Sequence, residues 1–180
     1  MSKIIEVKNY ECSKEDVFII DTNVYIYLYL NQSSNVDYID EYTDFYYQII
    51  ESNLKILTTS IQISEFFNRY SKMRFEEYKS KINADDSYKY KYYKKTTDYL
   101  DVLNELKLII QNRILSNSTA ISDNFEQQPI NQILRTGQPY DFNDEYLIHL
   151  ALLKDAKIVT HDKGIVFHDS DVEVITAHRL

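Results

Sequence analysis

Carboxylate side chains follow the short apolar segments of this sequence, at the points where we expect strands to end. Asp21 comes directly after VFII, and Asp162 follows KIVT with one residue between them. Glu65 lies in the first turns of the helix expected after KILT, while Asp141 and Asp144 begin the helix that leads to KIVT. Because ligands of open parallel sheets gather at the carboxyl ends of the strands, we expect these acids to share one edge.

Each of these acids also has an ordinary structural explanation when it is taken alone. The alternatives are an N-cap for Asp21 or Thr22, an N-cap for Asp141 or Asp144, a turn for Asp162 and an exposed helical acid for Glu65. The presence of all these acids at one edge favours a functional role, because it is costly for the fold. Like charges ~4 Å apart repel by about 4 kcal/mol at an effective dielectric constant near 20. A bound divalent cation would offset this repulsion, and oxygen ligands of high charge suit Mg²⁺ or Mn²⁺ rather than zinc.

The elements that must position these acids are short strands that alternate with longer helices. The expected strands are brief and rich in β-branched residues: VFII (17–20), KILT (55–58), KIVT (157–160) and VEVI (172–175). Apolar residues spaced i, i+3, i+4 and i+7 predict helices over 38–52, 60–78, 99–115 and 144–155. The long polar connection 116–142 contains a short expected helix near 130–134. This alternation predicts an α/β fold, with a short parallel sheet of four or five strands flanked by helices.

Composition favours a helix-rich intracellular protein. The 180 residues, 44% of them hydrophobic, suit one domain with its own core, and two glycines and two prolines argue against an all-β fold. Cys12 is the single cysteine, so we expect neither an internal disulfide nor a cysteine-rich zinc site. The N-terminal residues are charged throughout, and no apolar segment is long enough to span a membrane. We therefore expect a cytoplasmic protein without a membrane partner.

Three segments, FIIDTNV, TTSIQISEFF and DEYLIHLALLKDAKIVTHDKGI, occur in this order and are followed by a final short strand. In these segments the sequence resembles the PIN domains, metal-dependent ribonucleases that include the toxins of bacterial toxin-antitoxin pairs. The third segment is the most specific, with 18 residues from Asp144 to Asp162. The resemblance implies a PIN-like three-layer sandwich formed by residues 1–180 as a single domain.

The resemblance also implies a site and a reaction. Asp21, Glu65, Asp144 and Asp162 would be the catalytic and metal-binding residues, with Mg²⁺ or Mn²⁺ as the cofactor. Thr22, Asn23 and Thr160 would orient carboxylates or water. Asp141 is an additional acid that departs from the family pattern, and it would be either an N-cap, which we favour, or an auxiliary ligand. The implied activity is that of an endoribonuclease that hydrolyses RNA phosphodiester bonds and leaves a 3′-hydroxyl and a 5′-phosphate. An antitoxin-like inhibitor protein and a homodimer are left open by the sequence.

The middle of the chain departs from the compact toxins. Glu65 and Asp144 are 79 residues apart, which predicts an expanded relative with a basic helical insertion at about 70–116. The net charge of the whole chain is −8, yet residues 69–113 hold eleven basic and seven acidic side chains. Within them, SYKYKYYKKTTDYL (87–100) alternates tyrosines with Lys89, Lys91, Lys94 and Lys95.

Lysines beside aromatic rings can hold single-stranded RNA, because rings stack on bases while ammonium groups meet phosphates. We expect the four lysines of the 87–100 segment to bind RNA. The alternative is an amphipathic helix whose tyrosines pack and whose lysines stay in solvent, and 17 tyrosines along the chain weaken the first interpretation.

Two other functional classes compete with the nuclease. A catalytically silent PIN-like scaffold for protein partners would not need four mutually repelling acids. A phosphohydrolase that forms an aspartyl phosphate would want a second Asp two residues after the first, whereas the sequence here is Asp-Thr-Asn. With glycine only at positions 137 and 164, glycine-rich nucleotide loops are disfavoured as well.

Overall fold

A single parallel sheet forms the centre of the fold. The computed structural model describes residues 3–30, 37–134 and 141–179, and in these ranges the sheet has six strands in the order β1-β6-β5-β2-β3-β4. Every neighbouring pair is parallel. The strands are β1 (Lys3–Glu6), β2 (Val17–Ile20), β3 (Lys55–Thr58), β4 (Thr119–Ala120), β5 (Lys157–Val159) and β6 (Glu173–Thr176).

The four expected strands are present, and the two additional ones lie at the edges of the sheet. The expectation of four or five strands was too low, because β1 and β4 carry little of the pattern that marks a strand. β4 has two residues, both exposed, and β1 has no fully buried residue. An edge strand of this kind is held by its hydrogen bonds to a neighbour, which the sequence of the segment does not reveal.

Helices follow the strands, as the periodicity predicted. They are α1 (Thr22–Tyr29), α2 (Asp37–Glu51), α3 (Ser60–Lys81), α4 (Tyr90–Tyr93), α5 (Thr97–Ile109), α6 (Ile130–Ile133), α7 (Phe142–Lys154) and α8 (Lys163–Val166). A π-helical turn, Ile110–Ile114, continues α5, and single 3₁₀ turns cover Val7–Asn9, Leu115–Asn117 and Phe125–Gln127. The short helix expected near 130–134 is α6. Part of the polar connection 116–142 lies outside the described residues.

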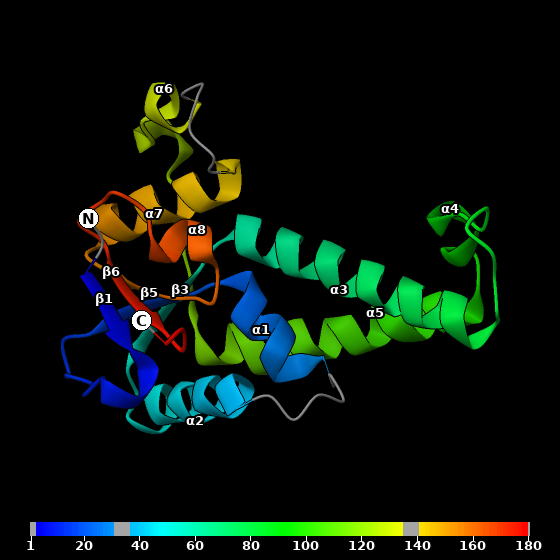
Figure 1. The fold of residues 1–180 in the computed structure, drawn as a ribbon, viewed down its shortest axis with the longest axis horizontal. Coiled ribbons are helices and arrows are strands. Elements are labelled where there is room, and N and C mark those ends of the chain that lie inside the picture. The colour runs from blue at the N-terminus through cyan, green and yellow to red at the C-terminus, as the bar shows by residue number, and fades with distance from the viewer. Residues whose placement is uncertain (1–2, 31–36, 135–140, 180) are drawn as a thin grey trace.

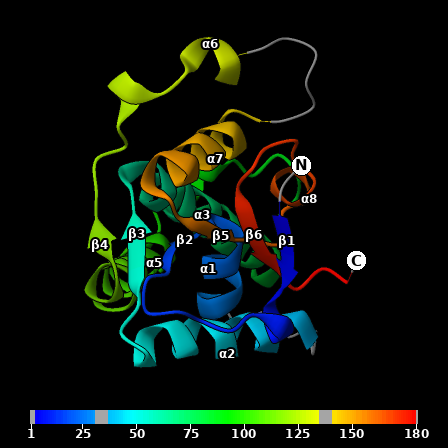
Figure 2. The same cartoon turned by 90° about the vertical axis from the view of Figure 1, so that its left-hand side faces the viewer.

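The two faces of the sheet are covered by different helices, which gives three layers. Phe18 and Ile20 of β2 face a core shared with α1, α2, α3 and α5, while Ile19 between them faces α7 and α8. This alternation is the expected period of two in a strand that is buried on both faces. Figure 2 shows α7 on one side of the sheet and α2 on the other.

Helices α3 and α5 run side by side and extend beyond the sheet, with α4 at the far end (Figure 1). The far end has a small aromatic core of its own, in which Phe75, Tyr93 and Tyr99 are buried. The expected helical insertion, 70–116, corresponds to the outer part of α3 together with α4 and α5. None of the described helices is both long and apolar enough to cross a membrane.

Candidate active site

The carboxyl ends of β2 and β5 meet at the centre of the sheet. β3, the next strand in the chain, pairs with β2 on one side, and β5 pairs with β2 on the other side. Ile20 pairs with Val159, and the backbone N–H of Asp21 donates to the Val159 carbonyl at 3.0 Å. Asp21 and Thr160 therefore lie next to each other, just beyond the strand ends. A crevice at such a reversal of strand order is where open α/β sheets bind ligands.

Asp21 occupies the N-cap position of α1, but its side chain makes no capping hydrogen bond. Its Oδ2 instead accepts hydrogen bonds from Asn23 Nδ2 at 2.7 Å and from Thr160 Oγ1 at 2.5 Å. The side chain is 7% exposed. The neighbouring Thr22 is buried too, and its hydroxyl has no hydrogen-bond partner within the described ranges. Asn23 and Thr160 thus hold the Asp21 carboxylate, whereas the Thr22 hydroxyl makes no such contact within the described ranges. The roles expected for these three residues in orienting carboxylates or water stay predictions.

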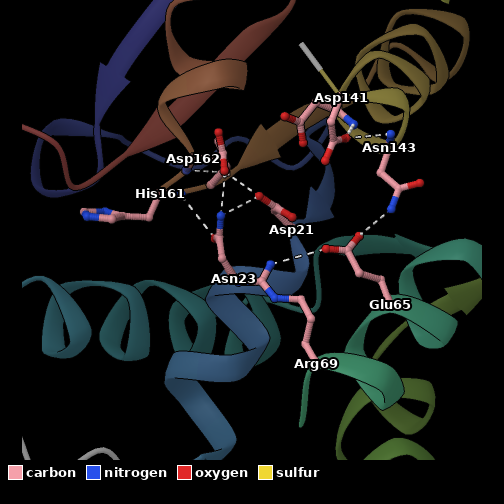
Figure 3. A network of polar contacts seen from close by, with 10 residues as sticks. Asp21, Asn23, Glu65, Arg69, Asp141, Asn143, His161 and Asp162 are labelled. Carbon is pink, nitrogen blue, oxygen red and sulfur yellow. Dashed lines mark hydrogen bonds and ion pairs between the residues drawn. The ribbon is translucent and has the colours of Figure 1, made fainter. Parts of the chain in front are cut away.

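Asn23 and Thr160 also fix the loop that carries Asp162. The Asn23 Nδ2 atom lies 3.2 Å from Thr160 Oγ1, and Asn23 Oδ1 accepts from the His161 backbone N–H at 3.2 Å. Thr160 Oγ1 accepts in addition from the backbone N–H of Asp162 at 2.8 Å. One network therefore positions both carboxylates (Figure 3).

Glu65 is positioned by the start of α3. Thr59 and Gln62 form a capping box there, and Gln62 Nε2 donates to the Ile20 carbonyl at 2.8 Å, which ties α3 to the end of β2. One turn further on, Glu65 Oε1 lies 3.3 Å from Arg69 Nη1, and Glu65 Oε2 accepts from Asn143 Nδ2 at 3.3 Å. Glu65 thus faces the other acids, and its carboxylate contacts the Arg69 guanidinium and the Asn143 amide (Figure 3).

The remaining acids lie at helix N-termini. Asp141 caps α7, because its Oδ1 accepts from the backbone N–H groups of Asn143 and Asp144 at 2.8 and 3.0 Å. The N-cap that we favoured for Asp141 is therefore observed. Asp162 caps the short helix α8 and accepts from Gly164 N at 2.6 Å. Asp144 lies in the first turn of α7.

Burial and mutual repulsion change the acidity of two of these carboxyl groups. The pKa of Asp21 is raised to about 6, mainly by burial and further by Glu65 and Asp162, although the Thr160 hydrogen bond and Arg69 lower it. The pKa of Asp144 is raised to about 8, by burial and by the charges of Asp141, Asp162, Asp21 and Glu65. The acids are therefore close enough to repel one another, as their positions in the sequence predicted.

Gly164 leaves room for two of the carboxylates. A Cβ atom built on this glycine would lie 3.0 Å from Asp144 Oδ2 and 3.0 Å from Asp162 Oδ1. Such a distance is shorter than ordinary contacts, so a side chain here would have to displace the carboxylates. The glycine in the HDKG segment thus allows the start of α8 to approach Asp144.

No model of a known protein family matches this sequence, and neither does any curated protein. Among solved structures, VapBC2 from Rickettsia felis, crystallised with a DNA fragment from its promoter, is similar with a TM-score of 0.55 and 14% identity. The match covers 89% of this chain and 98% of that one. The fold is PIN-like. PAE2754 from Pyrobaculum aerophilum has a TM-score of 0.48 and 16% identity, and the match covers 92% of this chain and 93% of that one.

The donor set of this PIN-like fold fits a hard divalent cation in charge and in atom type. Five carboxyl groups lie near one another at this edge of the sheet, and the pKa values of Asp21 and Asp144 are raised by burial first and then by the charges of neighbouring acids. However, within residues 3–30, 37–134 and 141–179 no three acidic, histidine or cysteine side chains already form a metal-binding group. A cation would therefore have to draw the carboxylates together and compete with Arg69 for Glu65.

The lysines expected to bind RNA lie elsewhere in the PIN-like chain. Lys89, Lys91, Lys94 and Lys95 belong to α4 and its flanks, at the far end of the α3/α5 pair from the sheet (Figure 1). Three tyrosines of the 87–100 segment pack on α3: Tyr88, Tyr90 and Tyr93 contact Phe75. The tyrosines thus pack as expected for the alternative, an amphipathic helix whose lysines stay in solvent. RNA binding by these lysines stays a prediction.

Four residues of the site were missed by the sequence analysis: Gln62, Arg69, Asn143 and Gly164. Gln62 had a recognisable signal, since Thr59 and Gln62 have the spacing of a capping box. Arg69 follows Glu65 by one helical turn, a spacing that predicts a side-chain ion pair. Nothing local indicated Asn143 or Gly164, because their partners come from distant parts of the chain.

Proposed function

We propose that this chain is a divalent-metal-dependent ribonuclease that hydrolyses RNA phosphodiester bonds at the site formed by Asp21, Glu65, Asp144 and Asp162. The observation that carries the proposal is the gathering of these acids at the switch point between β2 and β5, with raised pKa values for Asp21 and Asp144. A scaffold would gain nothing from this repulsion. When bound, Mg²⁺ or Mn²⁺ would offset the charge of the phosphate and of the transition state, and would make water more acidic.

The residues of the chain divide the remaining work. Asn23 and Thr160 hold Asp21 Oδ2, so that this carboxylate keeps a fixed direction toward the site. Asp144, with a pKa near 8, holds a proton at neutral pH in the absence of a cation and releases it when positive charge arrives. Arg69 partly neutralises Glu65, with 3.3 Å between Nη1 and Oε1, and its guanidinium is available for an incoming phosphate.

We also propose that the activity is that of a toxin, restrained by an inhibitor protein. The support is the similarity of fold to VapBC2 and the resemblance of the sequence to PIN-domain toxins. A small antitoxin-like reading frame upstream of the gene would support this assignment. Co-purification of its product with this chain, together with loss of cleavage in the complex, would test it directly.

Asp21→Asn tests the nuclease. The variant should lose cleavage of unstructured RNA in Mn²⁺, while its Tm without metal stays the same or rises, because one buried charge is removed. Mn²⁺ should raise the wild-type Tm by mass action and raise that of the variant much less. Asp44→Asn, a matched change at an exposed position of α2, should behave as wild type.

The alternative to the nuclease is a catalytically silent scaffold. It would show no RNA cleavage by the wild type and no Mn²⁺-dependent rise in its Tm. A loss of several degrees in the metal-free Tm of Asp21→Asn would instead identify Asp21 as a structural residue.

A further inference from the structure

A hollow of about 380 Å³ is lined by His161, the residue that precedes Asp162. Its lining combines three rings, those of Tyr38, His161 and His178, with the charged side chains of Asp37, Glu41 and Arg179. None of these residues takes part in the proposed hydrolysis. We call this hollow the ring pocket.

The rings of the ring pocket form a stack. His161 is stacked on His178 with 3.9 Å between ring centroids and on Tyr38 with 4.3 Å, at interplanar angles of 19° and 22°. Two rings cannot occupy the same face of an imidazole at these distances without touching, so His161 lies between the other two. A planar base can lie against such a stack, as bases do on aromatic residues of single-strand binding proteins.

The stack is held in place by the buried side chain of Tyr42. Its hydroxyl lies 3.1 Å from His161 Nδ1 and accepts from the Ala177 N–H at 2.8 Å. His178 Nε2 donates to the His161 carbonyl at 2.8 Å, which fixes the tautomer of His178 because a carbonyl can only accept. The two imidazole rings are therefore oriented before any ligand arrives, and little ordering of these rings would oppose binding.

The charged side chains of the ring pocket favour the edge of a base over a phosphate. Asp37 and Glu41 lie one turn apart at the start of α2. Asp37 is 3.9 Å from Arg179, and both side chains are exposed. Glu41 is half-buried and makes no hydrogen bond or ion pair with another described residue. A carboxylate repels phosphate but accepts two parallel N–H bonds, and guanine alone among the RNA bases offers two adjacent donors on its Watson–Crick edge.

We propose that the ring pocket binds one unpaired guanine of the RNA, with the base against the ring stack and its Watson–Crick edge at Glu41. The inference rests on the proposed ribonuclease and gives it a base preference. The pocket is linked to the acids by His161, which precedes Asp162 and whose backbone N–H donates to Asn23, the residue that holds Asp21. The guanine would thus belong to a nucleotide next to the cleaved bond.

The experiment compares unstructured RNA oligonucleotides that contain a single guanine with others in which adenine, cytosine or uracil replaces it. The wild type should cut beside the guanine. Tyr38→Ala should raise KM for the guanine oligonucleotide about tenfold with little change in kcat, as expected for one lost stacking contact, while Tyr38→Phe keeps the ring and the KM. Glu41→Gln should lose most of the preference for guanine, whereas Asp40→Asn, an equal charge change outside the pocket, should keep it.

A direct binding measurement separates this proposal from the ribonuclease itself. In the full-length Asp21→Asn protein, guanosine monophosphate should shift the ring NMR signals of His161 and His178 more than the other three nucleoside monophosphates do. Such a selective shift without any wild-type cleavage would support the pocket and reject the nuclease. Cleavage without base preference, or equal shifts with all four nucleotides, would overturn the pocket and leave the nuclease in place.

Discussion

Thr160 donates a hydrogen bond to Asp21, with 2.5 Å between Oγ1 and Oδ2, although the two residues are 139 positions apart in the sequence. The contact crosses from the end of β5 to the end of β2. It stabilises the ionised form of a carboxyl group whose burial favours the neutral form. The hydroxyl therefore keeps Asp21 closer to the charge state that a cation needs.

Replacing Thr160 by valine should weaken cation binding. Valine keeps the shape of threonine but removes the hydroxyl, so the pKa of Asp21 should rise further and the carboxylate should lose its orientation. We expect Mn²⁺ affinity to fall about tenfold, the usual cost of losing a residue that orients a ligand. Isothermal calorimetry at neutral pH measures this, with Thr160→Ser, which keeps the hydroxyl, as the control. Equal affinities of the valine variant and wild type would contradict the role.

The raised pKa values predict how stability depends on pH in the absence of metal. Between pH 3.8 and about 8, the folded chain keeps a proton on Asp144 that the unfolded chain has released. The unfolded state then binds fewer protons, so the free energy of unfolding must fall as pH rises through this range. Asp21 acts in the same direction up to its pKa of about 6.

His161 opposes this trend at lower pH. Its pKa is lowered from 6.5 to about 4, chiefly by burial, so it contributes stability that increases with pH up to 6.5. The decline should therefore be clearest between pH 6.5 and about 8, where Asp144 still titrates. Thermal melts in a chelator should show a falling Tm in this interval for wild type and a flatter profile for Asp144→Asn. A wild-type Tm that rises there would show that Asp144 is ionised throughout.

The sequence revealed the acids because strand ends are local features. VFII and KIVT are short, β-branched and followed by polar residues, so the side chains that lie at the sheet edge could be named from the chain alone. The sequence could not show what holds them. The partner of Thr160 is 139 residues away, and Gly164 matters only because α8 approaches Asp144. For the same reason β4, which is defined by its pairing with β3, was not predicted.

Gly164→Ala should impair the site with little effect on stability. Alanine normally favours a helix by about 1 kcal/mol relative to glycine, which offsets part of the cost of the close contacts that the new Cβ makes. The added Cβ would nevertheless lie 3.0 Å from oxygens of Asp144 and Asp162 and would push both carboxylates away. We expect RNA cleavage to fall at least about tenfold, since small displacements of reacting groups are costly. Lys163→Ala, at the exposed neighbouring position, is the control.

The basic far end of the α3/α5 pair should bind the RNA backbone at a distance from the acids. Outside residues 69–113 the chain has a net charge of −12, which repels a polyanion, so productive binding needs a local positive surface. Replacing Lys89, Lys91, Lys94 and Lys95 together by glutamine should weaken binding to unrelated single-stranded RNAs. It should also flatten the salt dependence by about 0.7 per lost phosphate contact, while cleavage at saturating RNA changes little.

The control for this variant is a change of equal charge elsewhere. Glutamine at Lys8, Lys14, Lys55 and Lys154 removes four positive charges outside the basic segment, so the net charge of the two proteins is the same. If RNA binding depended only on net charge, both variants would lose the same affinity and the same salt dependence. Binding by the far end predicts a loss in the first variant alone. A wild-type affinity and a wild-type salt dependence in the first variant would instead show that these lysines only form the solvent-exposed face of a helix whose tyrosines pack on Phe75.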